Sequence, residues 1–276
     1  SASTEAHVAP LSKLLQGDVR FVNLETPITR YGSESGMAPG GRPTGPLRFN
    51  ASPAVVKWLK GRVNAVSLAN NHALDQGELG RTETSALLRE QGIQVATPTT
   101  DAELKVRGRR IRLLARDLPE SWSPEDESTL ASRVREAREG GPVLVSLHWG
   151  RTGALLPTEE QRRLAEKLID AGATAVLGHG PHTPQGIQRH GRGVIAYSLG
   201  NLAFVCGCTD ERDAYVLRFR IDDAGAAVDV EAMPLQAGLY EPPRRAEDPG
   251  VAQLIHSLSE DLGSQARIEG GRVFIR

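Results

Sequence analysis

Apolar, strand-like runs alternate with helix-like patterns along most of the chain. Helices are expected over residues 53–60, 78–90 and 130–138, and in a segment after Thr158, where Gln161 has the spacing of a capping box. The strands expected between them are residues 18–22, 63–68, 93–96, 142–147 and 173–177. This alternation favours an α/β fold with a largely parallel sheet covered by helices.

The last quarter of the chain has a different pattern. Residues 215–221 and 227–233 predict antiparallel strands, residues 251–262 predict an amphipathic helix, and residues 268–275 predict a closing hairpin. No linker and no internal repeat is recognisable. We therefore expect one domain over residues 1–276, in which residues 1–205 carry the polar motifs and residues 206–276 complete a second sheet.

Other segments predict simpler local structure. Residues 1–16 indicate an arm with a short helix whose apolar side chains cover the edge of the core. Residues 29–45 are rich in Gly, Ser and Pro, which is typical of a mobile loop, and residues 118–127 also predict a loop. Further hairpins are expected over residues 104–115 and 186–197.

The bulk composition excludes several classes of function. Charge is balanced, with 33 Lys and Arg against 34 Asp and Glu, and no basic stripe supports nucleic-acid binding. The apolar runs are far shorter than the roughly 20 residues of a membrane helix, so no membrane span is expected. Cys206 and Cys208 are too few for a disulfide scaffold. Two ordinary thiols of a loop are the favoured interpretation, and a strained disulfide or half of a metal site are the alternatives for their C-x-C spacing.

Polar side chains recur where the expected strands end. Four of the seven histidines lie at such positions. Because the carboxyl ends of parallel strands meet at one edge of a sheet, we expect these side chains to converge. The set is Asn23 and Glu25; Asn70, Asn71, His72 and Asp75; His148; His179 and His182; and Ser198 and Asn201.

Imidazole, carboxylate and amide oxygens together suit one or two divalent ions such as Mn, Fe or Zn. Such ions polarise phosphoryl or carbonyl oxygens. Arg42 and Arg48, in or near the Gly-rich loop, are candidates for binding an anionic substrate, small or polymeric. Trp149 is interpreted as a packed wall, with lining of the pocket and contact with substrate as the alternative. Ser198 and Asn201 are interpreted as substrate contacts or as a turn that closes the site. No G-x-S-x-G motif is present, which disfavours a serine hydrolase.

Five blocks of this sequence resemble those of a known family, the bacterial capsule-synthesis proteins associated with poly-γ-glutamate (CapA-like). The blocks are Phe21–Thr29 (FVNLETPIT), Ser67–Gly77 (SLANNHALDQG), Ser146–Gly150 (SLHWG), Gly178–His182 (GHGPH) and Ala196–Asn201 (AYSLGN). The resemblance implies the calcineurin-like metallophosphoesterase fold, a four-layer αββα sandwich of two mixed sheets with two metals at the strand ends.

The resemblance also implies a role for each matching residue. Glu25 would bridge the metals, and Asn71 would bind one of them through its amide oxygen. His148 and His179 would complete that metal's ligands, while His182 would face the other metal. His72 would protonate the leaving group and Asp75 would orient it. Independently of the resemblance, Asn23 and Asn70 are candidates for contact with substrate because they lie at the strand ends.

One departure from the family pattern concerns the start of the chain. Members of the family open with a strand ending in Gly-Asp, whose Asp is a metal ligand. Gly17-Asp18 does not fill that role, because it begins the strand that leads to Asn23 and Glu25. The first strand is therefore expected to be missing here, through truncation rather than natural loss. The chain also begins without Met, so any leader or anchor is expected to have been removed or never included.

Three functions follow as hypotheses. The first is phosphoester hydrolysis by a metal-bound hydroxide, linked by the resemblance to capsule polymer synthesis. The second is hydrolysis or transfer of an amide, such as a γ-glutamyl link. The third is a non-catalytic protein that binds the polymer or a membrane synthase. The resemblance implies a place in the cell envelope or at the outer face of the cell.

Overall fold

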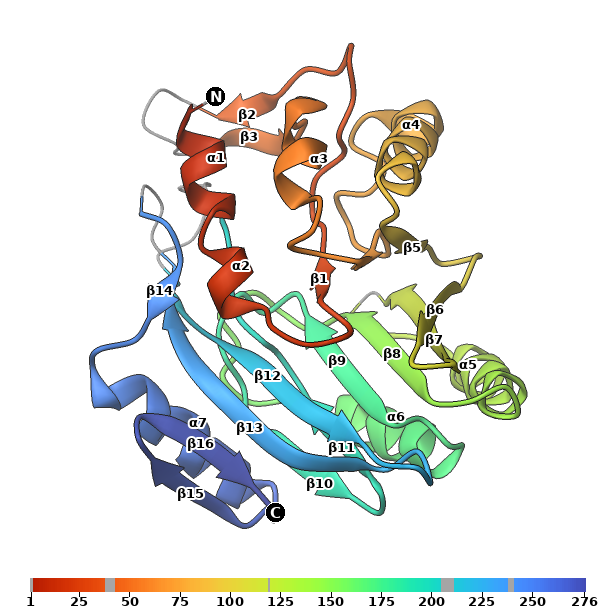
Figure 1. Cartoon of the computed structure of the whole chain (residues 1–276), viewed down its shortest axis with the longest axis vertical. Helices are drawn as coiled ribbons and strands as arrows, with labels where there is room; N and C mark the ends of the chain where they lie inside the picture. Colours follow the sequence, from red (N-terminus) through yellow and green to blue (C-terminus); the bar gives the residue numbers. More distant parts are fainter. Residues whose placement is uncertain (1, 38–42, 119, 205–210, 238–240) are drawn as a thin grey trace.

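Several β-sheets flanked by helices make up the computed structural model of the chain (Figure 1), which describes residues 2–37, 43–118, 120–204, 211–237 and 241–276. The protein is thus an α/β protein, as expected. The predictions for Arg42, Cys206 and Cys208 lie outside the described residues.

A three-stranded parallel sheet has the order β1-β4-β5. Its strands are short because each ends at a polar segment, and helices α3 and α4 connect them. Helices α1 and α2 pack on the same core, where Val8, Leu11 and Leu14 are buried, as the sequence predicted. The bounds are α1 Ala2–Val8, α2 Leu11–Leu14, β1 Phe21–Asn23, α3 Ala54–Leu59, β4 Ala65–Ser67, α4 Gly77–Glu90 and β5 Gln94–Ala96.

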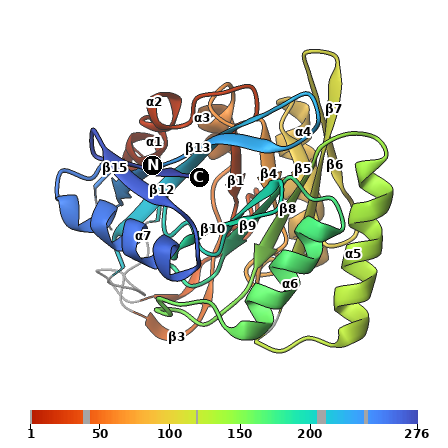
Figure 2. The ribbon, with the colours of Figure 1, turned by 90° about the horizontal axis from the view of Figure 1, so that it is seen from below.

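A six-stranded mixed sheet has the order β10-β11-β9-β8-β7-β6 and is parallel from β7 through β8 and β9 to β11. Helices α5 and α6 cover its outer face, and Figure 2 shows them side by side on that side of the molecule. The bounds are β6 Ala102–Val106, β7 Arg109–Asp117, α5 Pro124–Arg138, β8 Val143–His148, α6 Glu159–Asp170, β9 Ala175–His179, β10 Ile187–His190 and β11 Gly193–Ala196.

An antiparallel sheet built from the last quarter of the chain packs against the inner face of the six-stranded sheet. Its order is β12-β13-β16-β15, with β14 also paired to β13. The core between the two sheets combines Leu113 and Leu144 of the first with Ala232 and Val273 of the second, all buried. The bounds are β12 Asp213–Ile221, β13 Ala227–Gln236, β14 Arg244–Arg245, α7 Pro249–Asp261, β15 Ala266–Glu269 and β16 Arg272–Ile275.

Most predicted elements are present, with two differences. Helix α5 begins at Pro124, inside the segment predicted as a loop, because Ser123 and Asp126 form a capping box with Pro in the first turn. The segment predicted as a mobile loop contains a two-stranded ribbon, β2 (Ser35–Met37) and β3 (Pro43–Arg48). The capping box predicted for α6, between Thr158 and Gln161, is present.

Candidate functional site

The ends of β1, β4, β8 and β9 bring the predicted polar side chains together at one edge of the fold. In the register of β8 with β9, His148 lies opposite His179. In the register of β1 with β4, Asn23 lies opposite Ser67, so that the segment after each strand starts at the same level. Parallel pairing is what makes residues far apart in sequence neighbours here.

Glu25 lies at the centre of this cluster, with a side chain that is 15% exposed. Its Oε1 is 3.4 Å from His148 Nε2 and 3.8 Å from His182 Nε2. Burial disfavours the carboxylate, but the contact with His148 and the positive charges of His182 and His72 outweigh burial and lower the pKa of Glu25. The carboxylate is therefore ionised and faces two imidazoles.

Asp117 is a residue of the site that the sequence analysis missed. It ends β7 opposite His148 on β8, and its Oδ1 is 2.9 Å from His148 Nδ1. Burial disfavours the imidazolium, but the contacts with Asp117 and Glu25 outweigh it and raise the pKa of His148 to about 9. The sequence did contain a signal for Asp117, because a carboxylate follows directly on an apolar strand. It was missed because the strand was predicted to end at Ala115, two residues too early.

His179 has the opposite electrostatic character. Its ring is buried, and burial together with the charge of His148 lowers the pKa of His179 to about 3. It is thus neutral, which is the form of imidazole that binds metals. The ring lies 5.8 Å from that of Phe21.

His182 is held in position by its backbone and by Asn201. Its φ is +63°, in the left-handed region, which is uncommon for a residue with a side chain and costs energy unless the surroundings impose it. Its Nδ1 is 2.8 Å from Asn201 Oδ1, so its Nε2 is directed toward Glu25. Asn201 thus orients a histidine of the cluster.

His72 and Asp75 form a pair on the turn after β4. His72 Nδ1 is 2.8 Å from Asp75 Oδ2, which also accepts a hydrogen bond from the Phe49 backbone N–H at 2.7 Å. The His72 ring packs on Phe49 with 4.4 Å between ring centroids. The carboxylate thereby fixes one ring nitrogen of His72 and leaves the other for a ligand.

Asn23 and Asn70 connect the strand ends. Asn70 Nδ2 donates to Asn23 Oδ1 at 3.0 Å, and Asn23 Nδ2 donates to Glu25 Oε2 at 3.1 Å. The Asn23 amide thus holds Glu25 directly, and the Asn70 amide holds Asn23. Contact of either amide with substrate stays a prediction. Asn71, in contrast, is exposed on the turn.

Three other candidates lie outside the cluster around Glu25. Trp149 is 1% exposed, donates its Nε1–H to the Tyr197 carbonyl and stacks on Trp122, so it supports the strand ends from the core and does not line a pocket. Ser198 is fully buried and donates to the Thr183 carbonyl, which makes it part of a closing turn. Arg48 is exposed on β3.

The donor set fits a divalent ion in its chemistry. Two buried nitrogens, His148 Nε2 and His179 Nε2, form no hydrogen bond of good geometry among the described residues; His148 Nε2 lies only within ion-pair distance of Glu25. Carboxylate and amide partners on the far nitrogens, as at His148 and His182, are typical of metal-binding histidines. Within the described part of the chain, no three His, Cys, Asp or Glu side chains are already spaced as a complete metal site. Glu25 instead pairs directly with the imidazoles.

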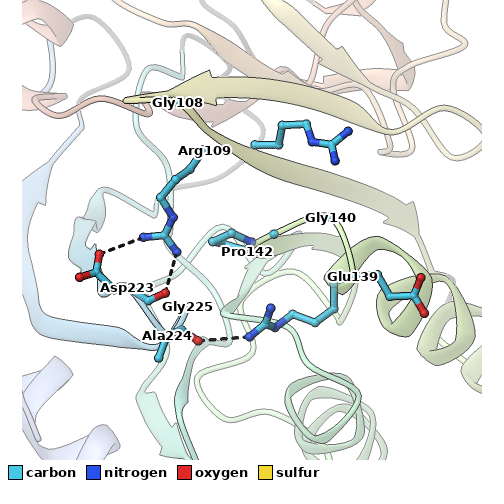
Figure 3. A pocket seen from close by; sticks show the side chains of 11 residues that line it. Gly108, Arg109, Glu139, Gly140, Pro142, Asp223, Ala224 and Gly225 are labelled. Atoms are coloured by element: carbon cyan, nitrogen blue, oxygen red, sulfur yellow. Dashed lines mark hydrogen bonds and ion pairs between the residues drawn. The ribbon is translucent and has the colours of Figure 1, made fainter.

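A hollow of about 510 Å³ lies away from this cluster, on the side of the fold where β7 and β8 begin (Figure 3). Arg109 donates to the Asp222 carbonyl at 2.9 Å, and Arg138 donates to the Ala224 carbonyl at 3.1 Å. These arginines bind the turn between β12 and β13 to the start of β7 and to the end of α5. The hollow has a structural explanation and is not a second candidate site.

Comparison with known proteins gives a consistent result. The family model described as "Bacterial capsule synthesis protein PGA_cap" matches residues 3–205. The "Capsule biosynthesis protein CapA" of Bacillus anthracis is 29% identical over 245 residues, which cover 80% of this chain and 59% of that protein. The "PGA biosynthesis protein CapA" of Bacillus subtilis is 26% identical, over 82% of this chain and 65% of that protein. The chain thus spans about six tenths of the length of these relatives.

The fold also has a counterpart among solved structures. A hypothetical protein from Thermus thermophilus superimposes with a TM-score of 0.55, covering 86% of this chain and 94% of that one. Sequence identity is 18%, so the likeness concerns the fold alone. No helix in the described residues is long and apolar enough to cross a membrane, in agreement with the sequence analysis.

Proposed function

The chain belongs to the bacterial capsule synthesis protein family, and from this membership and the geometry of the strand-end cluster we propose that it is a metal-dependent phosphoester hydrolase. The observation that carries the proposal is the convergence of Glu25, His148 and His182, with the unpartnered Nε2 of His179 beside them. We propose the calcineurin-like metallophosphoesterase arrangement for the fold, and capsule polymer synthesis as the process served.

Glu25, His148, His179 and His182 would hold the ion, and Asn71 would add an amide oxygen. A bound divalent ion would polarise the phosphoryl oxygen and lower the pKa of a coordinated water to about 7. The pKa of His148 is raised without the ion, so binding must displace its proton. Asp117 and Asn201 would keep the two rings in their orientations.

His72 would act as the general acid. Its Nδ1 is tied to Asp75, and its charge is close enough to Glu25 to lower the pKa of that carboxylate. The protonated ring can deliver a proton from Nε2 to the leaving oxygen of the ester, while Asp75 stabilises the charged imidazole. A positioned general acid contributes about 10²–10⁴-fold to the rate.

Turnover of bis(p-nitrophenyl) phosphate with added Mn²⁺ tests the proposal. We expect His72→Ala to lower kcat by about 10²–10⁴-fold while Mn²⁺ binding is kept. His148→Ala should lose both binding and turnover. The matched control is His190→Ala, which removes a histidine paired with Asp170 outside the cluster and should change neither.

Two alternative functions, cleavage or transfer of an amide bond and a non-catalytic role, predict different results when the same proteins are also assayed on the polymer. The capsule relatives are named for synthesis of a polymer, which motivates amide hydrolysis or transfer at a γ-glutamyl bond. Metal-dependent shortening of poly-γ-glutamate without phosphoester turnover would favour that function. A chain that binds less than one Mn²⁺, and whose behaviour is unchanged by His148→Ala, would favour a non-catalytic role in binding polymer or a synthase.

A further inference from the structure

Exposed apolar side chains gather beside the proposed proton donor. Where the structure describes the chain, six large apolar side chains are exposed, and three of them, Tyr31, Leu74 and Leu79, come from segments next to His72. Tyr31 is 93% exposed, Leu79 86% and Leu74 48%. Apolar side chains that gather next to a polar site, rather than lying scattered, are typical of a surface that meets a ligand.

Hydrogen bonds bring the segment of Tyr31 to the start of α4. The Ser33 N–H donates to Gln76 Oε1 at 3.3 Å, and Gln76 Nε2 donates to Ser33 O at 2.8 Å. Leu79 lies three residues after Gln76, on the same face of the helix. Figure 1 shows the segment between β1 and β2 running beside α4. Tyr31 and Leu79 therefore belong to one surface.

Phe49 and Leu74 connect this surface to His72. The Phe49 ring packs on the His72 ring, is half-buried, and lines the same pocket as Glu25. Leu74 lies in the turn that carries His72. Gln76 Nε2 also donates to Phe49 O at 2.9 Å, so one side chain holds Phe49 beside the segment of β2. The apolar patch, defined as Tyr31, Phe49, Leu74 and Leu79, thus begins at the proposed acid.

The charged side chains around Leu79 are paired with one another. Arg30 lies 2.9 Å from Glu83, and Arg81 lies 2.7 Å from Glu78. The two pairs carry no net charge, so the patch offers little to an anionic polymer. Surfaces that bind a bilayer usually add basic residues to their apolar ones. A few apolar side chains among neutral pairs fit the uncharged chain of a single molecule better.

The position of His72 identifies the part of a substrate that this patch would meet. In the proposed hydrolysis, water adds to phosphorus, the bond from phosphorus to the leaving oxygen breaks, and His72 Nε2 gives its proton to that oxygen. Because Nδ1 is held by Asp75, Nε2 is the nitrogen available for this transfer. The leaving alcohol is therefore the part of the ester that lies closest to His72 and to the patch.

We propose that the apolar patch binds the leaving alcohol of an amphiphilic phosphoester, with the phosphate at the strand-end cluster and an alkyl chain over the patch. The inference rests on the proposed function, because the hydrolysis determines which group leaves. It makes affinity depend on chain length. A fully buried methylene group raises affinity about fourfold, so one that is half covered on an open surface raises it about twofold.

Isothermal titration with n-alkyl phosphates from ethyl to octyl tests the inference. We expect affinity to rise about twofold per methylene group, both with Mn²⁺ and without it, because the chain contacts only side chains of the protein. In the double variant Tyr31→Ser/Leu79→Ser this rise should disappear, while affinity for ethyl phosphate stays within about twofold of wild type. Both side chains are exposed, so the variant should keep its far-UV circular dichroism.

Two matched controls separate the patch from other apolar surfaces. Ile268→Ser removes an exposed apolar side chain of β15, far along the chain from the site. Leu217→Ser changes the apolar lining between β1 and β12. Both variants should keep the twofold rise per methylene group. A rise that is lost in Leu217→Ser, or kept in the double variant, would overturn the proposal.

Turnover of bis(p-nitrophenyl) phosphate reports the proposed hydrolysis separately. Turnover together with affinities that do not depend on chain length would overturn this inference and leave the hydrolase. A rise that requires Tyr31 and Leu79, without any turnover, would refute the hydrolase and keep the binding site. Pelleting with phosphatidylcholine vesicles, or dimerisation, that is lost in the double variant while the alkyl series is flat would assign the patch to a bilayer or to a second copy, and would overturn the proposal.

Discussion

At the residue scale, the site depends on side chains that fix other side chains. Asp117 and Asn201 each hold the Nδ1 of a histidine, at 2.9 Å and 2.8 Å, and Asn23 holds Glu25. Such partners orient metal ligands and set their proton occupancy. The roles of Glu25, His148, His179 and His182 as ligands remain our proposal.

Asp117→Asn is expected to weaken Mn²⁺ binding by about 10–100-fold, because the amide cannot hold the His148 ring as the carboxylate does. Isothermal titration measures the affinity, and nitrogen NMR of the imidazoles reports the tautomer of His148 in the metal-free chain. The matched control is Asp170→Asn, which breaks an Asp–His contact of the same 2.9 Å at His190. Equal affinities in Asp117→Asn and wild type would contradict a positioning role.

The pKa of His148 gives a pH dependence with a defined sign. Its folded pKa is about 9, above the ordinary 6.5, so the folded state binds more protons between these values. The stabilisation is complete below pH 6.5 and is lost as the pH rises through about 9. In metal-free protein, the free energy of unfolding should fall over this window by on the order of 1–3 kcal/mol more than in His148→Gln. Urea unfolding measures the free energy at each pH. A difference between the two proteins that stays the same at every pH would refute this expectation.

At the scale of elements, helices α5 and α6 are joined by one buried carboxylate. Glu127 of α5 accepts from Arg163 at 3.0 Å and Lys167 at 3.3 Å, both of α6, and from Trp122 Nε1 at 3.1 Å. These three donors outweigh burial and lower the pKa of Glu127. The helices thereby keep a fixed position over the outer face of β8.

Glu127→Gln should lower the free energy of unfolding by about 1–3 kcal/mol. The neutral amide carries no charge to pair with Arg163 and Lys167, and it has only one oxygen to accept their hydrogen bonds. Urea denaturation measures the change as a lower midpoint with an unaltered slope. Glu136→Gln, an exposed position on the same helix, should shift the midpoint little. Similar shifts for both variants would mean that the cluster does not stabilise the helix pair.

At the scale of the whole molecule, the sheet made by the last quarter of the chain shares a core with the motif-bearing sheet. Ile255 of α7 is fully buried in that core, together with Leu113 and Val273. The two sheets are therefore expected to unfold together rather than as separate units.

Ile255→Ala should destabilise the whole protein by about 2–5 kcal/mol through loss of buried contacts and a residual cavity. Fluorescence of Trp122 and Trp149, which pack on the opposite face of the six-stranded sheet, should report the same lowered midpoint as far-UV circular dichroism. Ile268→Ala, at a half-exposed position of β15, is the control. Two separate transitions in Ile255→Ala would contradict a shared core.

The sequence alone predicted the alternation of strands and helices, the hairpins of the last quarter and the family. These follow from local periodicity, turn residues and contiguous motifs, such as the Thr158–Gln161 capping box, which need no distant partner. It also placed His148 and His179 at strand ends, because the length of an apolar run fixes where the polar residue falls.

Only the tertiary structure decided which of those polar side chains bind to one another. Parallel register set Asp117 beside His148, brought the Asn23 amide to Glu25 and the Asn70 amide to Asn23, and enclosed Trp149 in the core. These contacts join residues far apart in the sequence, and no local pattern of residues encodes which distant side chain lies beside which.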